Sequence, residues 1–116
     1  VGDDRPVLVS SDVPARMRVG ERRRVTIVIR NDGPRPWRRD HLVRLGSREP
    51  DNNLVWGPGR LEVPHDVAPG ATVTFAFDIT APATAGTYGS SWSLVREGVL
   101  WVPPIFRLGP VRVDAP

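Results

Sequence analysis

The sequence has 116 residues, a length typical of one domain, and 40% of them are apolar, which is enough to build a core. The net charge is +3, and it is uneven: residues 1–60 carry 13 Arg against 8 acids (+5), whereas residues 61–116 carry 3 Arg against 5 acids (−2). The absence of cysteine excludes disulfides, thiolate zinc sites and cysteine nucleophiles, and no apolar run approaches the roughly 18 residues of a membrane helix. We expect one domain over residues 7–116, preceded at 1–6 by a polar lead-in or linker end, with no membrane insertion.

The first half of the chain predicts short strands separated by strong turn signals. Val7–Val9 reads as a short edge strand. Residues 22–30 alternate polar and apolar side chains, with Ile27 at the centre of the apolar face, which is typical of a half-buried strand. The turn residues of 31–34 end it, and a further strand is expected over His41–Leu45. Leu54–Trp56 is a very short apolar segment closed by Gly-Pro-Gly.

The second half contains the clearest strands. Residues 73–79 place Phe75 and Phe77 on one alternating face, and residues 88–94 place Trp92 on another. Before them, Ala68-Pro69-Gly70 suits a type II turn, because proline fits the second position and glycine the third.

The end of the chain predicts an interrupted strand. Residues 99–102 run into Pro103-Pro104, which indicates an edge strand or a bulge and argues for a monomer, and residues 105–108 and 111–113 complete the pattern. About seven or eight short strands, with turn signals every 8 to 12 residues and no helical periodicity, predict an all-β protein. The expected fold is an immunoglobulin-like two-sheet antiparallel β-sandwich.

A local pattern supports this fold. The segment 85–90 has the form of a tyrosine corner, in which we expect the hydroxyl of Tyr88 to bond back across the sandwich. Ser90 occupies the position of the antibody-domain cysteine, so aromatic side chains must supply the packing between the sheets. The predicted structural core contains Ile27, Phe75, Phe77, Tyr88 and Trp92.

Catalytic and metal-binding patterns are absent from the sequence. His41 and His65 have no metal-ligand spacing, and we expect both to be solvated. Ser90 lies on a strand without a nucleophile-elbow motif, and Asp51 offers one carboxylate where a calcium loop has several. We therefore predict a protein that is not an enzyme and has no cofactor and no metal.

The tryptophans are the main candidates for ligand contact. Trp37 follows a turn, and the sequence favours a core or capping role for it over contact with a ligand. Trp56 and Trp101 fit two interpretations equally well: packing, or presentation of an indole face to a sugar or a peptide. The second interpretation gives the alternative of a carbohydrate-binding module that uses exposed Trp56 and Trp101.

The arginines of the first half form a second candidate. Arg22, Arg24 and Arg30 share one side of their strand and predict a basic stripe on one sheet. Interspersed acids favour a solvated outer face over nucleic-acid binding, so we expect no nucleic-acid partner. The candidate ligand or partner contacts are Trp37, Trp56, Trp101, Arg35, Arg38 and Arg39.

Three motifs together resemble a known family. They are RNDGPRPW at 30–37, VPHDVAPGATVTFAFDITAPATAGTY at 63–88 and SWSLV at 91–95. In this order they resemble the four-tryptophan (FW) immunoglobulin-like domain of selective-autophagy receptors and of many bacterial proteins. Ile27 stands where the autophagy version has its first tryptophan, and Trp101-Val102-Pro103 replaces a Phe-Gly, so the chain is more similar to bacterial members.

The resemblance implies a non-catalytic accessory module of a larger bacterial protein, acting in protein recognition or as a spacer. Its expected partners are another protein or neighbouring domains of the same polypeptide, with a glycan as the alternative. A further alternative is an accessory domain of a hydrolase whose catalytic part lies elsewhere. The resemblance favours an extracellular or cell-surface location, which composition alone leaves unknown.

Overall fold

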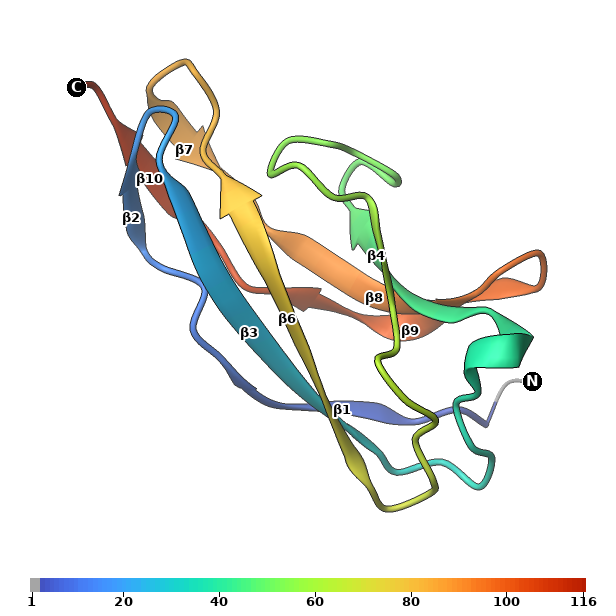
Figure 1. The fold of residues 1–116 in the computed structure, drawn as a ribbon. Coiled ribbons are helices and arrows are strands. Elements are labelled where there is room, and N and C mark those ends of the chain that lie inside the picture. The colour runs from blue at the N-terminus through green and yellow to red at the C-terminus, as the bar shows by residue number, and fades with distance from the viewer. Residues whose placement is uncertain (1–2) are drawn as a thin grey trace.

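The computed structural model describes residues 3–116, and within them the chain forms ten strands and one short 3₁₀ turn (Figure 1). The elements are β1 (Pro6–Ser11), β2 (Arg16–Arg18), β3 (Arg22–Asn31), η1 (Arg39–His41), β4 (Val43–Arg48), β5 (Arg60–Glu62), β6 (Thr72–Thr80), β7 (Gly86–Tyr88), β8 (Ser91–Arg96), β9 (Leu100–Arg107) and β10 (Val111–Asp114). The predicted all-β immunoglobulin-like sandwich is confirmed.

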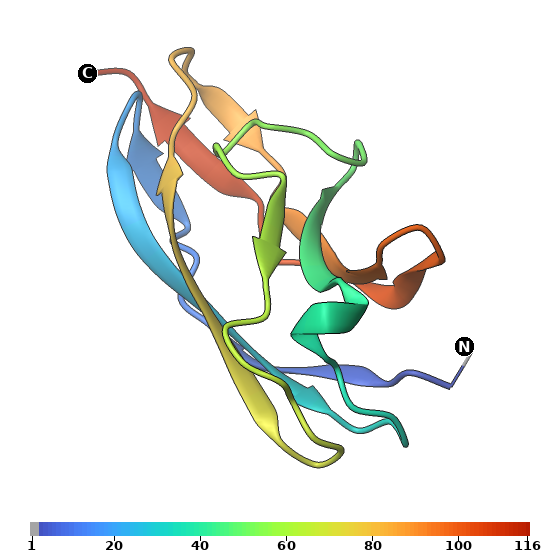
Figure 2. The same ribbon diagram turned by 45° about the vertical axis from the view of Figure 1, so that its right-hand side comes forward.

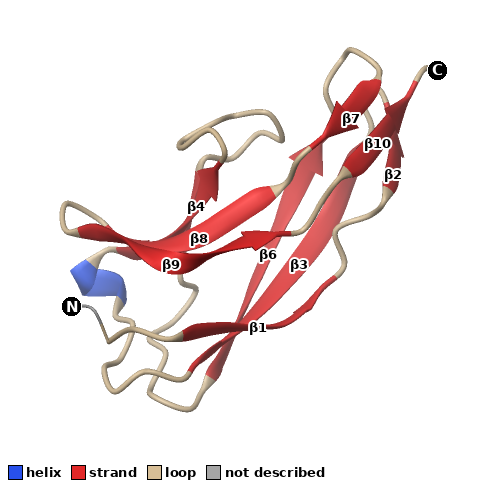
Figure 3. Ribbon diagram, turned by 180° about the vertical axis from the view of Figure 1, so that it is seen from behind, coloured by secondary structure: helices blue, strands red, loops and turns tan. Residues whose placement is uncertain are grey.

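The strands form three hydrogen-bonded ladders that make up two layers. One layer is β1-β3-β6. The other contains β5-β4-β8-β9 and its continuation β2-β10-β7, because only Gly89-Ser90 separates β7 from β8, and only residues 108–110 separate β9 from β10. Figure 3 shows this break as loop between β8 and β7 and between β9 and β10. There the Leu108 N–H donates to the Ser90 carbonyl over 2.7 Å, which continues the pairing across the interruption.

Breaks and short pairings explain why ten strands form where seven or eight are predicted. The segment 88–94, predicted as one strand, is divided at Gly89-Ser90. β2 was not predicted, because only Met17 of its three residues is buried and no alternation can be read from one side chain. It pairs parallel to β10, whereas the other strand pairs of the described chain are antiparallel.

Two boundaries differ from the sequence-based expectation. The strand predicted over His41–Leu45 begins at Val43, because His41 lies in the 3₁₀ turn and Leu42 adopts a left-handed backbone with φ 54°. At the start of the chain Pro6 already pairs with Asn31, and the Asp4 side chain is buried, so part of the expected lead-in is docked on the domain. The boundary between residues 6 and 7 otherwise stays a prediction.

The predicted turns and the proline-containing strand have the expected geometry. Gly70 has φ 86°, and the Ala71 N–H donates to Ala68 O over 2.9 Å, as a type II turn requires. β9 is an edge strand of its ladder, and its register with β8 shifts where Pro103 and Pro104 lie between Val102 and Phe106.

The core lies between the two layers and is sealed by aromatic packing. Ile27, Phe75, Phe77 and Trp92 are buried, and Tyr88 is partly buried against this core. The Phe77 and Trp92 rings meet edge to face with centroids 5.4 Å apart. Such a pair stabilises the fold by about 0.5–1.5 kcal/mol beyond the contribution of burying the two side chains. Aromatic side chains therefore contribute to inter-sheet packing, together with the aliphatic residues of the core.

The tyrosine corner is present, but its hydrogen bond is local. The Tyr88 hydroxyl donates to the Thr84 carbonyl over 2.6 Å, within the preceding turn, and does not reach across the sandwich. The Ser90 hydroxyl accepts a 3.0 Å hydrogen bond from the Trp92 indole, so the serine at the antibody cysteine position satisfies a buried polar group.

Candidate functional site

Two of the candidate tryptophans are buried. Trp37 is 1% exposed, and its backbone exchanges two 2.9 Å hydrogen bonds with Val67, so it caps the sandwich and cannot contact a ligand. Trp56 is 3% exposed, its indole N–H donates to the Gly89 carbonyl over 2.9 Å, and its ring meets the edge of Tyr88. Of the two interpretations of Trp56, packing is the one observed, and the alternative that needs an exposed Trp56 is not, because the loop that carries it folds back onto the domain.

Arg35 belongs to a cluster of ion pairs that includes the buried Asp4. Its guanidinium lies 3.1 Å from carboxylate oxygens of both Asp3 and Asp4, and Arg96 makes a two-point contact with Asp4 at 2.6 and 2.8 Å. The Asp4 side chain is 1% exposed. Burial raises the pKa of Asp4, but the hydrogen bond and charge of Arg96, together with Arg35 and Trp37, outweigh burial and hold the pKa below its ordinary value. This cluster docks the N-terminal segment onto β8.

The predicted basic stripe is largely neutralised. Arg22 and Arg24 both contact Asp78 on the neighbouring strand β6, at 2.8 and 3.5 Å, and Arg30 contacts Asp32 at 2.6 Å. The β3–β6 register places Arg24 directly opposite Asp78. A solvated outer face with paired charges is the observed arrangement.

Trp101 lies in a charged network on the outer face of the β5-β4-β8-β9 ladder. The Cζ atoms of Arg48 and Arg60 lie 4.3 and 4.7 Å from the centroid of its ring, and the side chain is half-buried. Gly46 makes room for it: a Cβ there would come within 2.7 Å of the ring and 2.8 Å of the Arg60 guanidinium. A glycine in β4 thus creates the seat for the indole.

Ion pairs extend this arrangement across the ladder. Glu97 accepts from Arg60 at 3.1 Å and from Arg44 at 3.0 Å, and Arg44 also contacts Glu62 at 3.2 Å. Hydrogen bonds from Arg44 and then Arg39 lower the pKa of Glu62. We call this set the Trp101 network; its members are Arg39, Arg44, Gly46, Arg48, Asp51, Arg60, Glu62, Glu97 and Trp101.

Of the six candidate contacts, only Arg39 and Trp101 share the Trp101 network. Arg38 instead pairs with Asp40 at 3.1 Å on the surface. The sequence patterns do not single out Arg44, Arg48 and Arg60 as site residues. The available signal was the spacing of Arg44, Gly46 and Arg48, which places two arginines on one strand face either side of a glycine.

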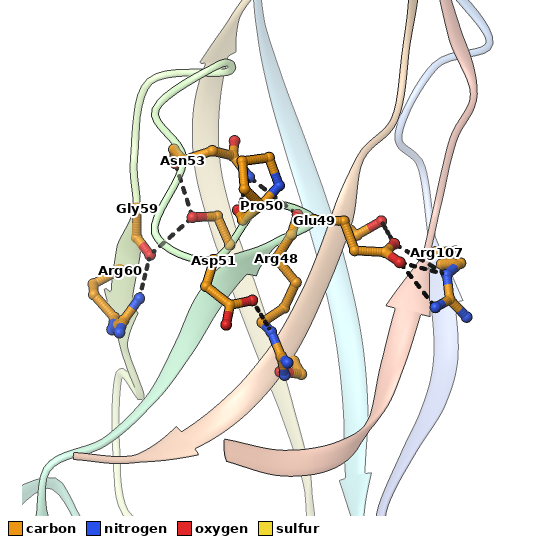
Figure 4. Close-up of polar contacts among 11 residues, drawn as sticks. Arg48, Glu49, Pro50, Asp51, Asn53, Gly59, Arg60 and Arg107 are labelled. Carbon is orange, nitrogen blue, oxygen red and sulfur yellow. Dashed lines mark hydrogen bonds and ion pairs between the residues drawn. The ribbon is translucent and has the colours of Figure 1, made fainter. Parts of the chain in front are cut away.

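The loop from Arg48 to Gly59 borders the network and is held by its own polar contacts (Figure 4). Glu49 accepts from Arg107 at 2.9 Å and from the Ser91 hydroxyl at 2.6 Å, and Asn53 donates to the carbonyls of Arg48 and Pro50. Glu49 has φ 60°, a left-handed backbone that favours glycine, and these contacts hold it there. The loop is therefore a fixed border of the site.

The remaining polar candidates do not form a reactive or metal-binding group. His41 and His65 lie on the surface, and Asp51 pairs with Arg48 at 2.5 Å. Across residues 3–116, no three His, Asp or Glu side chains come together as metal ligands. In that same part of the chain, no helix has the length and apolar character needed to cross a membrane.

The two-layer fold, the tyrosine corner and the network on an open sheet face define an immunoglobulin-like β-sandwich module. A family model described as the Ig-like domain from next to BRCA1 gene matches residues 14–102. The chain belongs to this immunoglobulin-like family. A search of curated proteins found no match.

Proposed function

We propose that the chain is a non-catalytic, FW-type accessory module of a larger bacterial protein, and that it recognises a protein partner through the Trp101 network. The observation that carries this proposal is the half-buried Trp101 under two guanidiniums on an open sheet face. Tryptophan and arginine are the residues most enriched at the energetic centres of protein interfaces.

The Trp101 network is preorganised for contact. Arg48 is fixed by Asp51 and by the Ser93 hydroxyl at 3.0 Å, and Arg60 by Glu97 and the Gly59 carbonyl. In the described chain, the Trp101 indole N–H donates to no other group, so it is available to a partner acceptor. Side chains that are already ordered lose little conformational entropy when they bind.

The FW-type and bacterial parts of the proposal have separate support. The three motifs at 30–37, 63–88 and 91–95 occur in the order of that resemblance, and the chain has four tryptophans. All 16 basic residues are arginine, a bias expected of a GC-rich genome.

A spacing role is the second candidate, favoured by the shape of the domain. Its principal extents are 46 × 23 × 20 Å, and the first described residues and the C-terminus lie far apart in both views (Figures 1 and 2). A glycan platform is less favoured, because Trp56 is buried and cannot act together with Trp101.

A photo-crosslinking amino acid in the full-length protein tests the proposal in its native host. Placed at Glu62, a member of the network whose side chain is 57% exposed, it should give a discrete adduct with another protein. Trp101→Ala should remove that adduct, and the same group at Arg112 on β10 is the matched control and should give none. Adducts from neither position would reject recognition in favour of spacing. Glycan-array binding that depends on Trp101 would instead reinstate the carbohydrate alternative.

A further inference from the structure

The outer edge of β6 is open along most of its length. β6 pairs with β3 over nine positions, from Arg30↔Thr72 to Arg22↔Thr80, without a register shift. Since the Thr80 N–H points away from β3, to the Trp56 carbonyl at 2.9 Å, the even-numbered residues direct their backbone groups outward. The outward groups of Thr74 and Ala76 have no hydrogen-bond partner within residues 3–116, and both residues are exposed.

The other edges of the sandwich carry features that discourage pairing. β1 has a register shift between Leu8 and Ser10, and β9 contains two prolines and its own shift. β2, β5 and β7 are three residues long. Bulges, prolines and short strands are the usual protections of an exposed edge, and β6 has none of them.

A groove of about 280 Å³ lies beside this edge. It is lined by the apolar residues Leu61, Pro64, Phe75 and Ala76, and by the charged residues Arg24 and Glu62. Leu61 and Pro64 form the apolar wall that faces the β6 edge from the other layer, since the Phe75 side chain is buried in the core. It opens where β5 and β6 run side by side on the same flank of the sandwich without pairing (Figures 1 and 2). Side chains on one face of a strand added to β6 would therefore meet an apolar surface.

The other face of an added strand would meet positive charge. On the outer face of the sheet, Arg22 and Arg24 share the single carboxylate of Asp78, which leaves one positive charge in excess beside the open edge. Successive side chains of a strand point to opposite faces. The complementary segment thus alternates aliphatic side chains, toward the groove, with acidic side chains, toward the arginines.

We propose that the β6 edge, from Thr72 to Asp78, binds an extended segment of a partner protein with alternating aliphatic and acidic residues, as an added strand. Backbone hydrogen bonds to Thr74 and Ala76 would provide the affinity. The groove and Arg24 would select for segments with aliphatic and acidic side chains. This surface shares Glu62 with the Trp101 network. The two proposals are tested by different variants, Ala76→Pro for the β6 edge and Trp101→Ala for the network, so either can fail without the other.

The test uses a synthetic peptide, acetyl-Thr-Val-Asp-Val-Glu-Val-Thr-amide, added to the isotope-labelled domain and followed by NMR. The amides of Thr74 and Ala76 should shift and gain protection from hydrogen exchange. A peptide with lysine in place of Asp and Glu should bind about tenfold more weakly or worse, as should the acidic peptide with Arg24→Glu.

Ala76→Pro is the decisive variant. Its N–H points away from β3, so proline removes no internal ladder bond and leaves the fold intact, but it blocks pairing at the edge. Peptide binding should be lost in Ala76→Pro and retained in Trp101→Ala. Binding that survives Ala76→Pro, equal binding of the lysine peptide, or no protection of Thr74 and Ala76 would overturn the proposal. Sedimentation showing a dimer of the domain that Ala76→Pro dissociates would overturn it too, by making a second copy the occupant.

Discussion

The buried ion pair between Asp4 and Arg96 gives the sharpest stability prediction. Asp4→Asn preserves the shape of the side chain but removes the charge that compensates Arg96. Breaking a buried pair typically costs about 3–5 kcal/mol. Because asparagine retains one acceptor oxygen, we expect the lower end, about 3 kcal/mol, which lowers the melting temperature of a domain of this size by about 10 °C.

The pH dependence of that loss identifies its cause. The pKa of Asp4 is lower in the folded state than its ordinary value of 3.8, so its contribution is fully present above about pH 4. It disappears as the pH falls through the folded-state pKa. The difference in unfolding free energy between wild type and Asp4→Asn, measured by urea titration from pH 7 to pH 2, should therefore narrow at the acid end.

Asp40→Asn is the matched control. Asp40, like Asp4, pairs with an arginine, in this case Arg38. The Asp40 side chain is 66% exposed, however, and solvent screens an exposed pair. We expect its melting temperature to match that of the wild type. A deficit in Asp4→Asn as small as in Asp40→Asn, or one that stays constant down to pH 2, would refute the assignment of a stabilising buried pair.

Three further substitutions test packing and hydrogen bonding. Tyr88→Phe removes the hydrogen bond to Thr84 and should cost about 1 kcal/mol by denaturant titration; no change would argue against a stabilising tyrosine corner. Phe77→Ala should cost about 3–5 kcal/mol in the same assay, because it leaves a cavity against Trp92, whereas Phe77→Leu should cost much less. Gly46→Ala should displace the Trp101 ring from its seat and red-shift tryptophan fluorescence, and an unchanged spectrum would contradict the close contact.

Local patterns in the sequence were sufficient for the sandwich. The alternation in 22–30 and 73–79 predicts β3 and β6 because each strand has one buried face, and burial imposes a period of two. The turn at Gly70 and the tyrosine corner were predictable because their geometry depends on residues that are close in the chain. β2 was not, because its position is fixed by pairing with β10, almost a hundred residues away.

The site was harder to predict because it depends on contacts between distant segments. Trp56 is buried against distant residues, Tyr88 and Gly89, and nothing within its own loop indicates those contacts. Trp101 gains its surroundings from Arg48 and Arg60, which lie on other strands. Likewise the charge on Arg22 is offset by Asp78, an acid that only the strand register brings near. The sequence shows how many charged residues there are, but only the folded structure shows which of them are already paired with an opposite charge.

The parallel pairing of β2 with β10 has a mechanical consequence. Arg16, Met17 and Arg18 lie opposite Arg112, Val113 and Asp114. β2 follows β1 in the first part of the sequence, and β10 is the last strand. A pull that separates the two ends loads this pair in shear, so its bonds must rupture together and cannot unzip one at a time. An array of such domains would therefore resist tension at the β2–β10 pair, without any disulfide.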